Sequence, residues 1–117
     1  MLTQLARPQW QSFFEQLSPL LRANVVQVES SGIGVDDRIS ADWVRLADLS
    51  YNAQNDVLEI CVHGADRAIH RPAQIHLHQD GAWLQSIEIV DGAGRRDVII
   101  LKEPLRLPDV VVSRPTP

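Results

Sequence analysis

The side chains most capable of chemistry lie in two apolar segments near the middle of the chain. Glu59, Cys61 and His63 alternate along one segment, and His76 and His78 alternate along the other. Alternate residues of a β-strand point to the same face of its sheet. The Cβ atoms of directly opposed residues on neighbouring strands lie about 4.5–5.5 Å apart. If the two segments are neighbours, Glu59 can contact His76.

Three interpretations of this cluster remain open from the sequence. Glu59 and His76 are weak candidates for acid–base catalysis, which needs a cleft that excludes water and shifts pKa values. His76, His78, Cys61 and His63 are weak candidates for a metal site, but zinc needs three or four ligands that converge at about 2.0–2.3 Å. We favour the third interpretation, the plain solvated face of an antiparallel sheet. No residue is assigned as catalytic or as a metal ligand, and no cofactor is expected.

Cys61 is the single cysteine of the chain, so no internal disulfide can form. A reactive thiol needs a lowered pKa from a nearby cation or helix N-terminus, and we expect Cys61 to be a small apolar filler. The sequence contains no Gly-x-Ser-x-Gly elbow, His-Glu-x-x-His helix, Cys-x-x-Cys pair or dinucleotide fingerprint.

Short segments of alternating apolar and polar residues, separated by turn residues, predict the strands that would position this cluster. The residues expected on the apolar face are Trp43, Ala47, Leu49, Tyr51, Leu58, Ile60, Val62, Ala73, Ile75, Leu77, Trp83, Ile87 and Ile89. Asp80-Gly81 is typical of a hairpin turn. The strand candidates are residues 25–30, 43–51, 57–63, 73–79, 83–90 and 96–101.

The apolar faces also predict a register, since a slip of one residue would turn every side chain over. A turn at 53–56 pairs Tyr51 with Leu58, and a symmetric connection at 64–71 pairs Ile60 with Ile75. A loop at 80–82 pairs Ile75 with Ile87. The same register predicts two rows on the opposite face: Ser50, Glu59, His76 and Ser86, then Asp48, Cys61, Gln74 and Glu88.

Residues 8–21 predict a helix with one apolar stripe. Pro8 suits the first helical turn, and Pro19 is expected to kink or end the helix at Ser18. The stripe is the natural cover for the apolar sheet face. It consists of Trp10, Phe13, Phe14, Leu17 and Leu21.

The chain is expected to form a single α+β domain over residues 1–117. The helix at 8–21 packs on a mainly antiparallel meander sheet of about six strands at 25–102, which can curl into a half-barrel. A Pro-rich tail follows at 103–117, where 110–112 is a weak candidate for an edge strand. The segment 31–42 is the best candidate for a mobile functional loop. Pro72 is expected to hold Arg71 in an extended conformation.

The composition disfavours nucleic-acid and membrane partners. The chain has 117 residues with 11 Lys and Arg against 15 Asp and Glu, a net charge of −4. Nucleic-acid binders usually carry a basic face, but the doublet Arg95-Arg96 is followed by Asp97.

No stretch approaches the roughly 20 apolar residues that span a bilayer, and no signal peptide is recognised. The lone cysteine suits a reducing compartment, so we expect a cytoplasmic protein.

Several motifs resemble the bacterial family catalogued as domain of unknown function 5335. They are Trp10 with Phe13, Leu46 to Tyr51, Asp56 to Ile60, Ile69-His70-Arg71-Pro72, Ile87-Glu88-Ile89 and Asp91-Gly92. Asp48 and Asn52 depart from the family pattern. The resemblance implies a small bacterial protein without an assigned activity, and it adds interest to His70 and Pro72.

Two functional hypotheses follow. The first is a non-enzymatic binding or accessory module that uses a sheet edge or the polar face to meet another protein or its own copy as a homodimer. The second is a small metal-dependent or acid–base enzyme centred on Glu59, His76 and His78. The absence of any recognisable catalytic motif favours the first.

Overall fold

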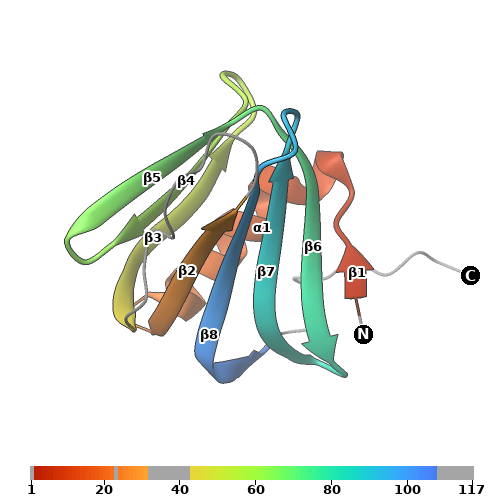
Figure 1. Ribbon diagram of the computed structural model, residues 1–117. Helices are drawn as coiled ribbons and strands as arrows, with labels where there is room; N and C mark the ends of the chain where they lie inside the picture. The colour runs from red at the N-terminus through yellow and green to blue at the C-terminus, as the bar shows by residue number, and fades with distance from the viewer. Residues whose placement is uncertain (1, 23, 32–42, 108–117) are drawn as a thin grey trace, which may run out of the picture.

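The structure is a computed structural model that describes residues 2–22, 24–31 and 43–107. One α-helix packs on an open, curled antiparallel sheet (Figure 1), so the α+β class is confirmed. The sheet order is β1-β6-β7-β8-β2-β3-β4-β5. The elements are β1 (Leu2–Gln4), a 3-10 turn η1 (Arg7–Gln9), α1 (Trp10–Leu21), β2 (Val25–Ser31), β3 (Val44–Asn52), β4 (Val57–Val62), β5 (Ala65–His70), β6 (Pro72–Asp80), β7 (Trp83–Asp91) and β8 (Arg96–Arg106).

The described chain has eight strands, two more than the six expected. Residues 2–4 pair with β6, and part of the segment 64–71 is strand β5 rather than a simple connection. Strand β5 is hard to recognise from its sequence because Arg67 occupies an inward position beside buried Ile69. An inward charge breaks the apolar alternation that identifies a strand.

Helix α1 places the predicted apolar stripe against the sheet. Trp10, Phe13, Phe14, Leu17 and Leu21 are each at most 1% exposed. Of the two effects expected of Pro19, an end at Ser18 is wrong, because the helix continues through Pro19 to Leu21, the last residue of the expected range 8–21. Pro19 lies in the last turn, where its exposed ring disturbs few helical hydrogen bonds.

The predicted register of β3 and β4 is confirmed: Tyr51 lies opposite Leu58, and Leu49 lies opposite Ile60. Near the start of β3, the buried side chains change from even-numbered to odd-numbered positions along the chain. The register shifts between Leu46 and Asp48, so Leu46 is buried while Ala47 is exposed. Trp43, which was also expected on the apolar face, is 42% exposed.

The predicted register beyond β4 is wrong. Strand β5 takes the place next to β4 that was assigned to residues 73–79, so Ile60 lies opposite Arg67 and not Ile75. Ile75 pairs with Ile89 rather than Ile87, because the register shifts beside the Asp80 turn. Similar shifts expose Ala73 and Trp83, which were expected on the apolar face.

Arg71 is not extended, as Pro72 had suggested, but has a φ of 53°. Its N–H donates to the Asp56 carbonyl at 2.9 Å, and its carbonyl accepts the Gly92 N–H at 3.1 Å. These two bonds hold a conformation that costs a non-glycine residue free energy. They also bring together the β3–β4, β5–β6 and β7–β8 connections at one end of the sheet (Figure 1).

Strand β8 extends through Pro104 to Arg106, beyond the expected end of the meander at 102. The predicted functional loop falls largely on residues 32–42, and the weak strand at 110–112 falls in the tail. Both lie outside the described residues.

Candidate functional site

His76 and His78 lie on the sheet face opposite the helix, as their parity predicted, because Ile75 and Leu77 between them are buried. The acidic partner of His76 is Glu88 rather than Glu59. His76 Nδ1 lies 3.1 Å from Glu88 Oε1. Arg96 Nε lies 3.1 Å from the other Glu88 oxygen. Glu88 is therefore shared between an imidazole and a guanidinium.

The predicted pairing of Glu59 with His76 is wrong, because β4 and β6 are separated by β3, β2, β8 and β7. The neighbours of Glu59 are Ser50, as expected, and Ala68. His63 follows β4 and is exposed. Among the residues that the structure describes, no group of three or more His, Cys, Asp or Glu side chains could hold a metal ion.

Cys61 lies on β4 between Asp48 of β3 and Asp66 of β5. Burial raises the pKa of the Cys61 thiol, and the negative charge and hydrogen bond of Asp66 raise it further. Both effects disfavour the nucleophilic thiolate. The surroundings of Cys61 therefore do not activate it as a nucleophile.

A buried polar tie joins strand β5 to the centre of the sheet. Arg67 Nε donates to Asp97 Oδ1 at 2.6 Å, and the Ser30 hydroxyl donates to the same oxygen. The side chain of Asp97 is 2% exposed and that of Arg67 is 25% exposed. Because a buried carboxylate is costly without partners, this tie fixes β5 relative to β8 and β2.

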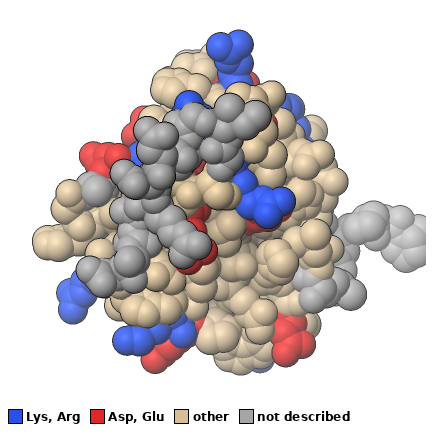
Figure 2. Space-filling model, viewed as in Figure 1, with Lys and Arg blue, Asp and Glu red and all other residues tan. Residues whose placement is uncertain are grey.

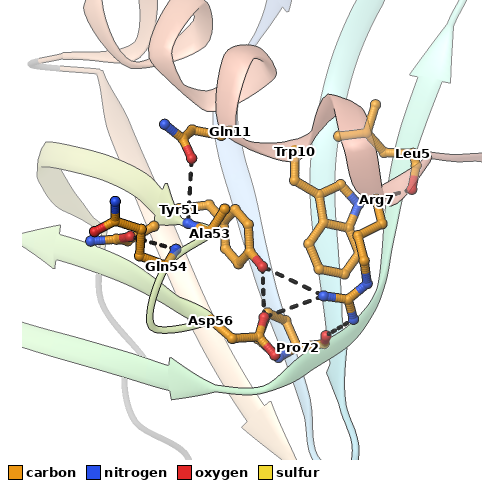
Figure 3. A network of polar contacts seen from close by, with 10 residues as sticks. Leu5, Arg7, Trp10, Gln11, Tyr51, Ala53, Gln54, Asp56 and Pro72 are labelled. Carbon is orange, nitrogen blue, oxygen red and sulfur yellow. Dashed lines mark hydrogen bonds and ion pairs between the residues drawn. The ribbon is translucent and has the colours of Figure 1, made fainter.

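A second polar network lies at the end of the sheet where the three connections meet (Figure 3). The Arg7 guanidinium donates to the Pro72 carbonyl at 2.8 Å and lies 3.3 Å from Asp56 Oδ1. It also lies 4.3 Å above the Trp10 ring, a cation–π geometry. The Tyr51 hydroxyl donates to Asp56 at 2.6 Å. Arg7 thus fastens the start of the helix to the β3–β4 turn and to β6.

Burial raises the pKa of Tyr51, and the hydrogen bond to Asp56 raises it further. The hydroxyl therefore stays protonated at neutral pH and acts as a hydrogen-bond donor. The network is suited to holding chain segments together rather than to nucleophilic chemistry.

A shallow cleft adjoins this network. Within it, Asp91 Oδ1 accepts the N–H groups of Ala93 and Arg95, each at 2.9 Å, so this carboxylate stabilises the β7–β8 turn. The cleft is lined by His70, Arg71, Asp91, Gly92, Ala93 and Arg95.

Strand β5 leaves one side of its backbone without a partner strand in the sheet of the described residues. Hydrogen-bonded pairs alternate along an antiparallel ladder. Because Arg71 N–H bonds to the Asp56 carbonyl, the backbone groups of Arg67 and Ile69 also face β4. Those of Asp66, Ala68 and His70 face outward, and their side chains are exposed.

Charges of both signs are scattered over the face seen in Figure 2, which shows no continuous basic band among the residues it colours. No helix in the described part of the chain is long and apolar enough to cross a membrane.

Three residues that organise the site were missed by the sequence analysis: Arg7, Arg67 and Asp97. A signal existed for Asp97, since it shares the inward parity of Ile99 and Leu101 on β8. An acidic residue at such a position requires a buried cation or donor. No comparable pattern marks Arg7, whose hydrogen-bond partners are 44 to 65 residues away in the chain.

Comparisons with known proteins agree with the earlier resemblance. The sequence model of a family of unknown function, DUF5335, matches residues 1–110. An uncharacterized protein of Aquifex aeolicus is 30% identical over 106 residues, which cover 90% of this chain and 96% of the relative. No solved structure matches. Among the motif residues that suggested the family, Trp10, Tyr51, Asp56 and Pro72 lie together in the network of Figure 3.

Proposed function

This chain belongs to DUF5335, a family of unknown function, and we propose from its geometry that it is a non-enzymatic binding module. Its edge strand β5 accepts an extended strand from another polypeptide. The single observation that carries this proposal is the outward-facing backbone of Asp66, Ala68 and His70 on a terminal strand of the sheet.

An unpaired strand edge is a template for another strand, since main-chain hydrogen bonds supply affinity and neighbouring side chains supply specificity. Strand β5 has six residues, whereas the opposite edge, β1, has three. A three-residue edge offers few hydrogen bonds, so β5 is the better docking strand.

The polar ties described above support the proposal because they hold β5 in place before a partner arrives. Asp97 anchors Arg67 in the middle of the strand, and Asp56 anchors Arg71 just beyond its end. A preorganised edge loses less conformational entropy on binding. An inward charge such as Arg67 often protects an edge from pairing, but here Asp97 already neutralises it.

The enzymatic alternative has less support. It is centred on Glu59, His76 and His78, but four other strands separate the strand of Glu59 from the strand of the two histidines. The thiol of Cys61 and the hydroxyl of Tyr51 both have raised pKa values.

Site-specific crosslinking tests the proposal. A photocrosslinking residue replaces Asp66, and the protein is expressed in cells that naturally make it. We expect a defined adduct with a polypeptide chain that disappears when Ala68→Pro is added. Proline removes the outward N–H without removing a bond to β4. The matched control Ala68→Val keeps this N–H and should keep the adduct.

Absence of any polypeptide adduct at Asp66 would overturn the proposal. An adduct that survives Ala68→Pro unchanged would also overturn it, because contact would then not depend on strand pairing. Circular dichroism and urea unfolding of each variant confirm that the fold is retained.

A further inference from the structure

We infer that the strand added at β5 is β5 of a second copy, which forms a two-fold symmetric dimer with a sheet continuous across both chains. This inference rests on the proposed function and names its partner. The argument comes from the order of residues along the strand and from the direction in which each backbone group faces.

One antiparallel register uses every outward-facing backbone group. When the two-fold axis passes beside Ala68, this residue lies opposite Ala68 of the second copy. Asp66 then lies opposite His70 of the second copy, and His70 opposite its Asp66. These are the residues whose N–H and C=O groups face outward in both chains. Such opposed residues can exchange paired hydrogen bonds. Registers centred elsewhere leave some of these groups without a partner strand.

The side chains agree with the same register. It places the Asp66 carboxylate opposite the His70 imidazole, which can donate a ring N–H to it, on both sides of the axis, and all three outward side chains are exposed. A hydrogen-bonding pair on directly opposed residues stabilises a strand pair, whereas two directly opposed carboxylates destabilise it. At the axis, where a residue meets itself, the small side chain of Ala68 carries no charge and avoids steric conflict.

The inner face of the pair is also compatible. Arg67 would lie opposite Ile69 of the second copy. Its guanidinium is held by Asp97 within its own chain, so no unpaired charge faces the partner. Because an isologous contact uses the same surface twice, each favourable pair occurs twice.

Sedimentation of the purified full chain over a range of concentrations tests the inference. The wild type should show a reversible monomer–dimer equilibrium. Asp66→His places imidazoles opposite each other, and His70→Asp places carboxylates opposite each other. Since each change affects two symmetric pairs, each should raise the dimer Kd about tenfold. The double exchange, Asp66→His with His70→Asp, restores the imidazole–carboxylate pairs and should restore most of the affinity.

Rescue by the double exchange distinguishes pairing from a merely structural role, since two damaging substitutions would otherwise add. Ala68→Pro gives a second readout: it should shift the wild-type dimer to monomer. Urea unfolding of the variants, measured at a concentration where all are monomeric, checks that each remains folded.

Two results would overturn the inference: a wild-type protein that stays monomeric at every concentration, or a double variant no better than either single variant. If that monomeric protein still gives a crosslink to a different polypeptide that depends on Ala68, the proposed function stands and the second copy is excluded as its partner. If neither the dimer nor a crosslink forms, both proposals fail.

Discussion

Single buried charges determine how firmly strand β5 is held. Asp97 is almost fully enclosed, while its partner Arg67 reaches partly into solvent, with a side chain 25% exposed. The two members of this ion pair therefore should not respond equally to substitution. Removing Arg67 leaves a buried carboxylate with Ser30 alone, whereas removing the Asp97 charge leaves a guanidinium that can turn toward water.

We predict that Arg67→Ala lowers the free energy of unfolding by about 3 kcal/mol, because it isolates a buried charge. Asp97→Asn should cost only about 1–2 kcal/mol, since the amide can still accept a hydrogen bond from Ser30. Urea unfolding measures both. Arg45→Ala, at an exposed position of β3, is the control and should change stability by less than about 0.5 kcal/mol. A larger loss in Asp97→Asn than in Arg67→Ala would contradict this account.

Tyr51 gives a prediction that depends on pH. Its pKa is raised above the ordinary value of 10.0, first by burial and then by Asp56. The folded state therefore holds the hydroxyl proton more tightly than the unfolded state. This contribution to stability is complete below pH 10 and is lost as pH rises through the folded-state pKa.

Tyr51→Phe should lower the free energy of unfolding by about 1 kcal/mol at neutral pH, because the hydrogen bond to Asp56 is lost. Wild-type stability should then fall more steeply than that of the variant as pH rises above about 10. Urea unfolding at several pH values measures both slopes. Parallel curves for the two proteins would show that Tyr51 does not titrate differently on folding.

At the scale of elements, Pro19 is the clearest conflict between local preference and tertiary packing. Proline is unfavourable inside a helix, yet α1 continues for two further residues because Leu21 is fully buried. Pro19 itself is exposed, so a substitution there creates no cavity.

Pro19→Ala should raise the free energy of unfolding by about 1–2 kcal/mol, since the helical gain exceeds the entropy that alanine restores to the unfolded chain. Thermal unfolding should show a higher Tm. Pro8→Ala, in the 3-10 turn where proline is tolerated, is the matched control and should produce no gain. A lower Tm for Pro19→Ala would mean that proline is the better residue in this last turn.

The elements were predictable where the apolar pattern is local. The helix stripe and the β3–β4 hairpin follow from spacing within short segments, and both are observed. The register shifts at Leu46, Pro72, His78 and Leu84 were not predictable, because each moves the strand pairing without a recognisable signal in the sequence.

In the candidate site, too, features set by the local sequence were predicted correctly, and features set by distant residues were not. The parity of His76 and His78 was correct because it depends only on neighbouring buried residues. The partner of His76 was wrong, since it depends on which strands are adjacent in the sheet. Strand β5 was missed because the ion pair that makes inward Arg67 tolerable joins residues 30 positions apart.

At the scale of the whole molecule, we propose that the chain is one domain. One cluster of buried side chains includes residues of helix α1 and of strands β2 to β8. The helix and the sheet should therefore unfold together. Trp10 is buried and Trp83 is 48% exposed. Two variants therefore report different regions by fluorescence. Because the chain has a third tryptophan, Trp43, both variants carry Trp43→Phe: adding Trp10→Phe leaves Trp83 as the fluorescent reporter, and adding Trp83→Phe leaves Trp10.

The urea transitions followed by fluorescence in these two variants should each coincide with the transition that circular dichroism records for the same variant. The substitutions change stability separately, so the comparison is made within each protein. Transitions that separate within one variant would indicate two folding units.

The most direct test of the central claim, that β5 pairs through its outer edge, is amide hydrogen exchange of the unaltered protein in dilute and concentrated solution. The account predicts that the N–H groups of Arg67 and Ile69 are protected at both concentrations, because they bond to β4. Those of Asp66, Ala68 and His70 should exchange quickly when dilute and become protected when concentrated. Exchange at these three residues that does not change with concentration would contradict the account.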